Sequence, residues 1–260
     1  MSKLNKEPKC ELFNDNFENF KRYGLPKAQL IIADIPYNIG ANAYGSNPVW
    51  YKGGDNKNGE SDKAKASFFN RDGYFNVINF MDFARKMMIK EPKKPGLAPA
   101  MIVFCAWQQI PMLIAEGKKE GLKHAFPITF NKPTSAQVLK ANMRIVGATE
   151  YALVFYRDKL PKFRNNGHMI LDHFPWVTDN SYPKLHPTQK PVPILQRLIE
   201  IFTDPGDVVI DPTAGSGSTL RAAVELGRDA YGFEVERDIY NKAKKYMLSS
   251  YQTSLDLFAR

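Results

Sequence analysis

Apolar positions recur along this chain with two different periods, and segments with one period alternate with segments that have the other. Short apolar runs bounded by polar or turn-forming residues are typical of buried strands. We predict strands over 29–33, 100–105, 125–130, 150–156, 207–211 and 229–233. Elsewhere apolar residues return every three or four positions, which is typical of helices with one buried face. We predict helices over 76–90, 108–120, 192–202, 217–226 and 237–249.

The order of these elements indicates the fold class. Strands alternate with helices, which is typical of a doubly wound α/β sheet. A chain of 260 residues can bury a substantial core, so we predict one domain over 1–260. The segment 38–75 has no regular pattern and interleaves glycines with aromatic residues. Long loops in compact domains are usually functional or disordered, so we predict a flexible flap there.

A first chemical pattern, Asp34-Ile35-Pro36-Tyr37, follows the apolar run 30–33. Pro36 lacks an N–H and cannot continue a central strand, so the chain turns there. Ligands of open α/β sheets bind at the carboxyl ends of strands. Asp34 and a turn carbonyl could accept the two N–H bonds of a planar amine while Tyr37 stacks on its face. Taken alone, the tetrapeptide also fits an ordinary turn.

A second pattern, residues 211–219, links a predicted strand to a predicted helix through a tight turn with Gly215 and Gly217. Both glycines would let the backbone approach a ligand, and the helix N-terminus offers N–H groups. Glu234 ends the next predicted strand, where a carboxylate can accept hydrogen bonds from ribose hydroxyls. No Gly-Lys-Ser/Thr follows the glycines, and Leu220 replaces a third glycine. An adenosine-containing ligand therefore fits better than a P-loop or dinucleotide ligand.

Together these residues resemble the S-adenosylmethionine-dependent amino-methyltransferases of DNA. Asp34–Tyr37 is similar to the family motif D/N/S-P-P-Y/F, and 211–219 is similar to D-P-F-x-G-S-G-T. His186–Pro191, with the sequence H-P-T-Q-K-P, resembles the motif before the cofactor strand. The catalytic motif precedes the cofactor motif, as in the permuted β class. Ile35 departs from the family because it replaces the usual first proline.

The resemblance implies a Rossmann-like methyltransferase sheet, mostly parallel with one antiparallel strand, for which we choose 150–156 paired with 125–130. It implies S-adenosylmethionine as cofactor. The catalytic residues implied are Asp34, Pro36 and Tyr37. The cofactor-binding residues implied are Asp211, Pro212, Gly215, Gly217, Glu234, His186, Thr188 and Lys190. For His186, capping a proline-rich loop is the alternative.

The resemblance also implies the reaction. A methyl group would pass to the exocyclic N6 of adenine in double-stranded DNA after base flipping. Within the family an initial Asp accompanies adenine more often, and an initial Ser accompanies N4 of cytosine. The alternatives are an N4-cytosine enzyme, an RNA or protein-amide N-methyltransferase, and a silent nucleic-acid-binding module. We expect Tyr37→Phe to keep much of the activity, since stacking needs the ring.

Charge agrees with a polyanionic partner. The formal net charge is +9. From Lys132 to Lys190 the chain has nine Lys or Arg against four Asp or Glu. Basic groups suit phosphates, so we predict a target-recognition region over 132–185, inserted within the domain. Its DNA-binding candidates are Lys159, Lys162 and Arg164.

The cysteine content and the hydropathy restrict the class of protein. Two cysteines, Cys10 and Cys105, are too few and too far apart for a disulfide framework or a zinc site, and we predict no metal. No apolar run approaches the ~18 residues of a membrane span, and the first residues lack a signal-peptide core. We expect a cytoplasmic protein. A homodimer and a restriction endonuclease partner stay open.

Overall fold

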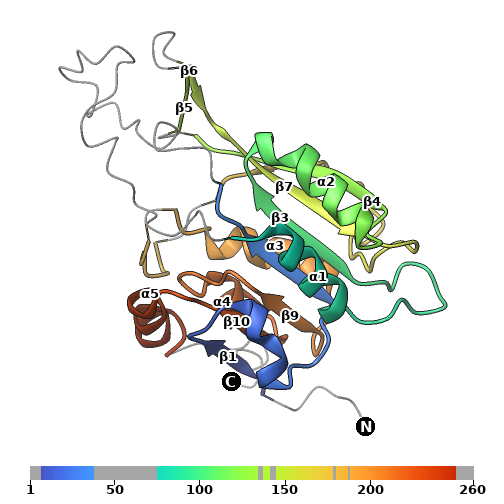
Figure 1. Cartoon of the computed structure of the whole chain (residues 1–260). Coiled ribbons are helices and arrows are strands. Elements are labelled where there is room, and N and C mark those ends of the chain that lie inside the picture. Colours follow the sequence, from blue (N-terminus) through green and yellow to red (C-terminus); the bar gives the residue numbers. More distant parts are fainter. Residues whose placement is uncertain are drawn as a thin grey trace.

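The central element is an eight-stranded sheet with the strand order β1-β10-β9-β2-β3-β7-β4-β8 (Figure 1). The computed structural model describes residues 7–37, 75–133, 137–140, 145–177, 180–186 and 188–249. The strands of this sheet are β1 (Cys10–Phe13), β2 (Leu30–Asp34), β3 (Ala100–Cys105), β4 (His124–Asn131), β7 (Thr149–Tyr156), β8 (His173–Pro175), β9 (Val208–Asp211) and β10 (Asp229–Phe233). A separate hairpin consists of β5 (Gln137–Lys140) and β6 (Ile145–Gly147).

One strand of the large sheet runs against the others. β7 is antiparallel to both of its neighbours, β3 and β4. The other neighbouring pairs of this sheet are parallel. This confirms the predicted doubly wound, mostly parallel α/β fold with one antiparallel strand. As a consequence, the first residues of β7 lie at the same edge of the sheet as the carboxyl ends of β3 and β4.

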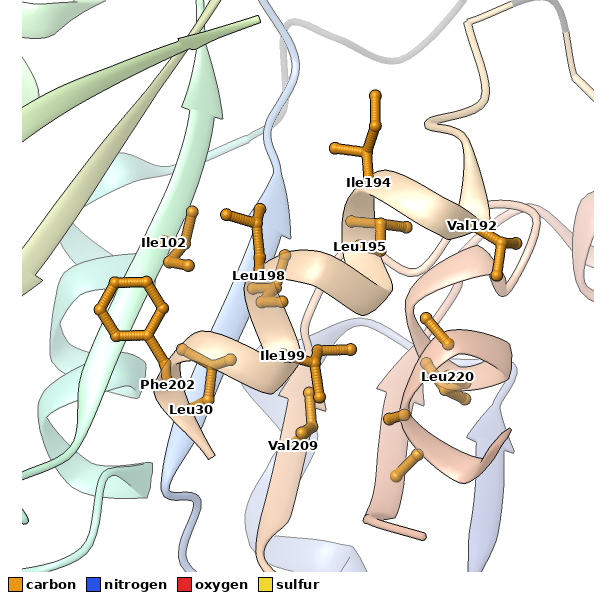
Figure 2. Close-up of a cluster of buried hydrophobic side chains, with 14 of the residues drawn as sticks. Leu30, Ile102, Val192, Ile194, Leu195, Leu198, Ile199, Phe202, Val209 and Leu220 are labelled. Carbon is orange, nitrogen blue, oxygen red and sulfur yellow. The ribbon is translucent and has the colours of Figure 1, made fainter. Parts of the chain in front are cut away.

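Helices cover both faces of the sheet, because strand side chains alternate between the faces. Leu30 and Ile32 of β2 belong to a core shared with α3 (Val192–Phe202) and α4 (Ser218–Glu225). Ile31 and Ala33 belong to a core shared with α1 (Val77–Met87) and α2 (Ile110–Lys119). Figure 2 shows side chains of α3 pointing toward Leu30 and Val209 on the strands beneath. Both faces of β2 are therefore buried, as its uninterrupted apolar sequence requires.

The predicted helices are present, with local differences at their ends. α3 has the predicted bounds. α1 ends three residues early, because Met88 adopts an extended conformation and bridges to Ala28. α4 begins at Ser218, since Gly217 has a φ of 80° and cannot be helical. The last predicted helix is α5 (Arg237–Lys242) followed by a π-helical turn, Ala243–Met247.

Sequence patterns missed the short strands. β1 and β8 lie at the two edges of the sheet, and neither has a run of apolar residues. The hairpin β5–β6 was also missed, and it projects beyond the large sheet (Figure 1). The predicted region 132–185 contains this hairpin and also β7, which lies inside the sheet, and its role in target recognition stays a prediction. The predicted flap, 38–75, lies outside the described residues except for Phe75.

Within the described residues, no helix has the length and apolar character needed to cross a membrane.

Candidate active site

Asp34 stands at the carboxyl end of β2 with one carboxylate oxygen paired and the other available. Its Oδ2 accepts a hydrogen bond from Lys190 Nζ at 2.7 Å. Its Oδ1 is buried, and no donor among the described residues reaches it. The Asp34 side chain is 32% exposed overall, so the burial concerns this one oxygen. A buried acceptor without a donor costs free energy and is suited to an incoming N–H group.

Glu150 is a residue of this site that the sequence analysis missed. It lies near the start of β7, and the reversed direction of that strand brings it to the edge that holds Asp34. The Tyr37 hydroxyl donates to Glu150 Oε2 at 2.6 Å, and Lys132 Nζ pairs with Oε1. Burial raises the pKa of Glu150, but Lys190 and Lys132 outweigh it and lower the pKa to about 2. Glu150 is therefore ionised and orients the Tyr37 ring.

Lys190 contacts the turn Asp34–Tyr37, whereas the resemblance had assigned Lys190 to the cofactor. Besides Asp34, its Nζ lies 3.4 Å from the Tyr37 hydroxyl and 5.2 Å from the centre of the Phe104 ring. The side chain is only 7% exposed. Burial lowers the pKa of Lys190, but Asp34 and Glu150 outweigh it and raise the pKa. Lys190 thus supplies a buried positive charge between two carboxylates.

Gln109 is a second residue that the sequence analysis missed. It follows β3 in a 3₁₀ turn, Trp107–Gln109, and its Nε2 donates to the Pro36 carbonyl at 2.8 Å. The Pro36 carbonyl is one of the two predicted acceptors for a substrate amine. No pattern in the sequence marks Gln109, because its partner comes from a different strand.

The predicted cofactor residues gather beside Asp34. Asp211 ends β9, which lies next to β2, and its Oδ1 accepts the Thr213 N–H at 2.9 Å. Burial raises the pKa of Asp211 to about 7, against the Thr219 and Thr213 hydrogen bonds. Glu234 follows β10, is buried, and accepts the Glu236 N–H at 2.6 Å. The loop with Pro212, Gly215 and Gly217 connects β9 to α4 and lies at the same edge of the sheet as these two carboxylates.

Three glycines shape this loop in different ways. A Cβ at Gly215 would meet nothing closer than the Thr213 carbonyl, at 3.9 Å, so this backbone has the open side that an adenosine-containing cofactor needs. At Gly217, a Cβ would lie in ordinary van der Waals contact with Leu248, at 3.4 Å, so the φ of 80°, and not a lack of space, favours glycine there. The space beside Gly215 fits the predicted approach of a ligand, and the role of Gly217 in that approach stays a prediction.

Gly232 is the third of these glycines, and it makes room for the loop itself. A Cβ there would lie 2.7 Å from Leu220 and 2.9 Å from Ala214. Its absence lets the loop and the start of α4 pack closely on β10, where the Ala214 N–H donates to the Phe233 carbonyl at 2.8 Å. The residues present therefore fit a cofactor bound over Gly215, on a loop that is packed against β10.

Comparison with known proteins identifies the family. A family model described as DNA methylase matches residues 28–245. The chain belongs to the DNA methylase family. This methylase is 32% identical over 168 residues to YubD of Escherichia coli (strain K12), which is named as a methylase. That match covers 65% of this chain and 68% of YubD.

Two solved structures have the same fold. The crystal structure of the M1.HpyAVI–SAM complex has a TM-score of 0.62 and 20% identity, covering 90% of this chain and 97% of that one. PvuII DNA methyltransferase, which is cytosine-N4-specific, has a TM-score of 0.61 and 15% identity, covering 98% and 94%. The predicted membership of the amino-methyltransferase family and the predicted cofactor, S-adenosylmethionine, are confirmed. This methylase is accordingly an S-adenosylmethionine-dependent DNA methyltransferase.

His186 and Thr188 of the methylase form a local turn. His186 Nδ1 lies 2.9 Å from Thr188 Oγ1 and accepts the Thr188 N–H at 3.3 Å. Burial, helped by Lys190 and Lys242, lowers the pKa of His186, which favours the neutral ring. These contacts match the capping role that was the alternative for His186. Cofactor binding by His186 and Thr188 stays a prediction.

The three basic DNA-binding candidates lie at the opposite edge of the sheet. They follow the carboxyl end of β7, and this strand runs against its neighbours. Lys162 is buried and pairs with Asp207 at 2.5 Å, while Arg164 pairs with Asp204 at 2.5 Å. Lys159 Nζ donates to the carbonyls of Pro92 and Lys93. These side chains have partners within the protein at that edge, and their assignment to DNA stays a prediction.

Within the described residues, no group of three or more His, Cys, Asp or Glu side chains could hold a metal ion.

Proposed function

We propose that this methyltransferase acts on the exocyclic N6 of adenine in double-stranded DNA, and that the target base leaves the duplex to reach Asp34. The observation that carries the proposal is Asp34 Oδ1, a buried acceptor without a donor among the described residues, at the edge that also holds the cofactor loop. An adenine amine has two N–H groups. One would donate to Asp34 Oδ1 and the other to the Pro36 carbonyl.

The two acceptors act on the reactivity of the amine. Its lone pair is delocalised into the ring, so the planar amine is a weak nucleophile. Hydrogen bonds to Asp34 and the Pro36 carbonyl favour a pyramidal nitrogen and localise the lone pair. The Asp34 carboxylate also stabilises the positive charge that develops on this nitrogen, at a site already fixed before the reaction. Positioning therefore contributes more than acid–base chemistry.

Lys190 favours the ionised form of Asp34, and Glu150 orients the Tyr37 ring. Burial raises the pKa of Asp34, while the ammonium of Lys190 opposes that rise. An ionised carboxylate is purely an acceptor, so the ion pair favours the form that can receive an amine. The Glu150 carboxylate fixes the Tyr37 ring through its hydroxyl. Stacking on such a ring contributes about 1–3 kcal/mol per base. This offsets part of the few kcal/mol that base flipping costs.

The cofactor would lie over Gly215 with Glu234 on its ribose. S-adenosylmethionine supplies the electrophilic methyl group when it is bound. Asp211 holds the loop by accepting the Thr213 N–H, and Glu234 holds the backbone after β10. Because β9 and β2 are adjacent, these groups and Asp34 border the same part of the edge. This supports direct transfer between neighbouring ligands.

Identification of the methylated base tests the proposal. The purified protein is incubated with duplex DNA and tritiated S-adenosylmethionine, the DNA is digested to nucleosides, and the labelled nucleoside is identified by mass. We expect N6-methyladenine, because Asp34 begins the motif where a serine accompanies cytosine. Label in N4-methylcytosine would overturn the assignment of adenine as the target base and leave the proposed amine chemistry intact. Parallel reactions are run with RNA and with protein. If RNA or protein is labelled in preference to DNA, the result would favour an RNA or a protein-amide substrate.

We expect Tyr37→Phe to lower methyl transfer about tenfold. This loss is larger than the one predicted from stacking alone. The hydroxyl donates to the buried Glu150, a hydrogen bond to a charged group contributes about 1.5–3 kcal/mol, and each 1.4 kcal/mol corresponds to a factor of about ten. Tyr37→Ala should lose more, because stacking is lost as well. The measurement is kcat/KM for DNA. Tyr156→Phe, at the other end of β7, is the matched control and should behave as wild type. An unchanged Tyr37→Phe variant would argue against this orienting role.

DNA would approach the edge that holds Asp34. The hairpin β5–β6 projects there from the predicted target-recognition region 132–185 (Figure 1). Lys132 and Trp176 also lie at this edge, with Lys132 Nζ 4.7 Å from the centre of the Trp176 ring. We propose that this part of 132–185, and not 157–164, contacts DNA. The homodimer and the restriction endonuclease partner stay predictions.

A further inference from the structure

We propose that Lys132 is a positioning residue of this methyltransferase, which holds Glu150 in place and, through it, the Tyr37 ring that stacks on the target base. The inference rests on the proposed function, since that ring is the one assigned to the flipped base. It starts from a basic residue at the beginning of the predicted target-recognition region 132–185. A lysine in such a region is expected to contact a phosphate, but the contacts of Lys132 favour a different role.

The ammonium of Lys132 has two partners within the protein. Its Nζ pairs with Glu150 Oε1 and lies 4.7 Å from the centre of the Trp176 ring. The side chains of Lys132 and Glu150 are 22% and 11% exposed, so the ion pair is largely shielded from water. Charges attract more strongly when they are shielded, and removing one member of a buried pair leaves the other without compensation. The ammonium is therefore bound to Glu150 and is not free for a phosphate.

The backbone around Lys132 fixes the place of its side chain. Lys132 directly follows β4, and its N–H donates to the carbonyl of Ala148, just before β7, at 2.7 Å. The N–H of Trp176, just after β8, donates to the Asn131 carbonyl at 3.0 Å. The hairpin β5–β6 lies in the chain between Lys132 and Ala148, so Lys132 stands at the base of this hairpin. These main-chain bonds stay in place when only the side chain is changed.

Glu150 connects Lys132 to Tyr37. One carboxylate oxygen of Glu150 pairs with Lys132, and the other accepts the Tyr37 hydroxyl at 2.6 Å. Among the described residues, the other cation paired with Glu150 is Lys190, at 3.8 Å, and this lysine is bonded to Asp34 at 2.7 Å. Without Lys132, the carboxylate of Glu150 would turn toward Lys190, and the Tyr37 hydroxyl would lose its fixed acceptor. Because methyl transfer depends on positioning, a displaced ring lowers the rate of the chemical step.

The first test replaces Lys132 by methionine, which has a similar length and no charge. We expect kcat for DNA methylation to fall about tenfold, similar to the loss in Tyr37→Phe, because the same hydrogen bond to a charged group is disturbed. Calorimetric binding of S-adenosylmethionine should equal that of wild type at a temperature where both proteins are folded. Lys123→Met, at the other end of β4 in an exposed pair with Asp158, is the matched control and should keep wild-type kcat. Label is counted in total methylated nucleoside, so the result does not depend on which base is modified.

The salt dependence of DNA binding separates positioning from phosphate binding. Each phosphate contact that is lost reduces the slope of log affinity against log salt concentration by about 0.9. We expect the slope for Lys132→Met to equal that of wild type, because its ammonium is bound to Glu150. A slope reduced by about 0.9 would show a phosphate contact and overturn the inference.

A double-mutant cycle with Tyr37→Phe separates positioning from general support. The hydroxyl is absent in Tyr37→Phe, so Lys132→Met should lower kcat by less than about twofold in that background. If Lys132→Met does not fold, the cycle is run with Lys132→Gln, which leaves a neutral donor for Glu150 and should lower kcat about threefold in the presence of the hydroxyl. In either series, equal losses in the two backgrounds, or wild-type kcat in the single variant, would overturn the inference. Failure of wild type to methylate any DNA base would instead overturn the proposed function.

Discussion

Asp34→Asn is expected to lower methyl transfer to DNA about 100- to 1,000-fold while leaving S-adenosylmethionine binding unchanged. The loss matches that caused by removing one preorganised group that stabilises developing charge. Asparagine keeps the shape of the side chain but has no negative charge to place beside the amine nitrogen. The measurement is kcat with tritiated cofactor, together with calorimetric binding of the cofactor.

The choice of asparagine follows from the contacts of Asp34. Asp34→Ala would leave the buried Lys190 ammonium without its 2.7 Å partner, and breaking such a pair costs about 3–5 kcal/mol. We therefore expect the alanine variant to be less stable than the asparagine variant. Asp158→Asn, an exposed site at the opposite edge, is the control. Wild-type methylation by Asp34→Asn would refute the proposed mechanism.

Lys190→Met should reduce both stability and methyl transfer, and it should leave cofactor binding intact in the folded protein. The substitution removes the positive charge between Asp34 and Glu150, and we expect the free energy of unfolding to fall by about 3–5 kcal/mol. Asp34 would also lose the charge that opposes the rise of its pKa. Chemical denaturation and calorimetry at one temperature measure the two effects separately.

The double variant Asp34→Asn/Lys190→Met is the control for this interpretation. Removing both members of a buried ion pair costs far less than removing one, so the double variant should be more stable than Lys190→Met. It should remain inactive, because the carboxylate is absent. If Lys190→Met unfolds like wild type but no longer binds S-adenosylmethionine, Lys190 returns to the cofactor role that the resemblance implied.

The direction of β7 explains why Glu150 was missed and why the basic candidates lie away from Asp34. An alternating or continuous apolar pattern reads the same when a strand is reversed, so the pattern of 150–156 carries no direction. The resemblance implied one antiparallel strand, but charge alone chose Lys159, Lys162 and Arg164. Reversal puts the end of β7 at the far edge, with these residues, and puts Glu150 beside Tyr37.

The cofactor loop also has some features that the sequence predicts and others that depend on tertiary packing. The strand, the two glycines and the following helix were all predictable, and so was the positive φ that Gly217 has. Which side chains each glycine faces was not predictable. Gly217 faces Leu248, which comes from the end of the π-helical turn about thirty residues later, and Gly232 faces Leu220 and Ala214. Such contacts depend on how separate elements pack.

The sequence by itself determined the alternation of strands and helices, the α/β class, and the meeting of Asp34 with the 211–217 loop and Glu234. Local periodicity and turn chemistry act within a few residues, and the carboxyl ends of parallel strands always share one edge. Only the tertiary structure decided the partners of those residues: Lys190 on Asp34, Glu150 on Tyr37, and Gln109 on Pro36. The physical reason is that buried charges and amides find their partners across strands, where packing and strand direction set the distances.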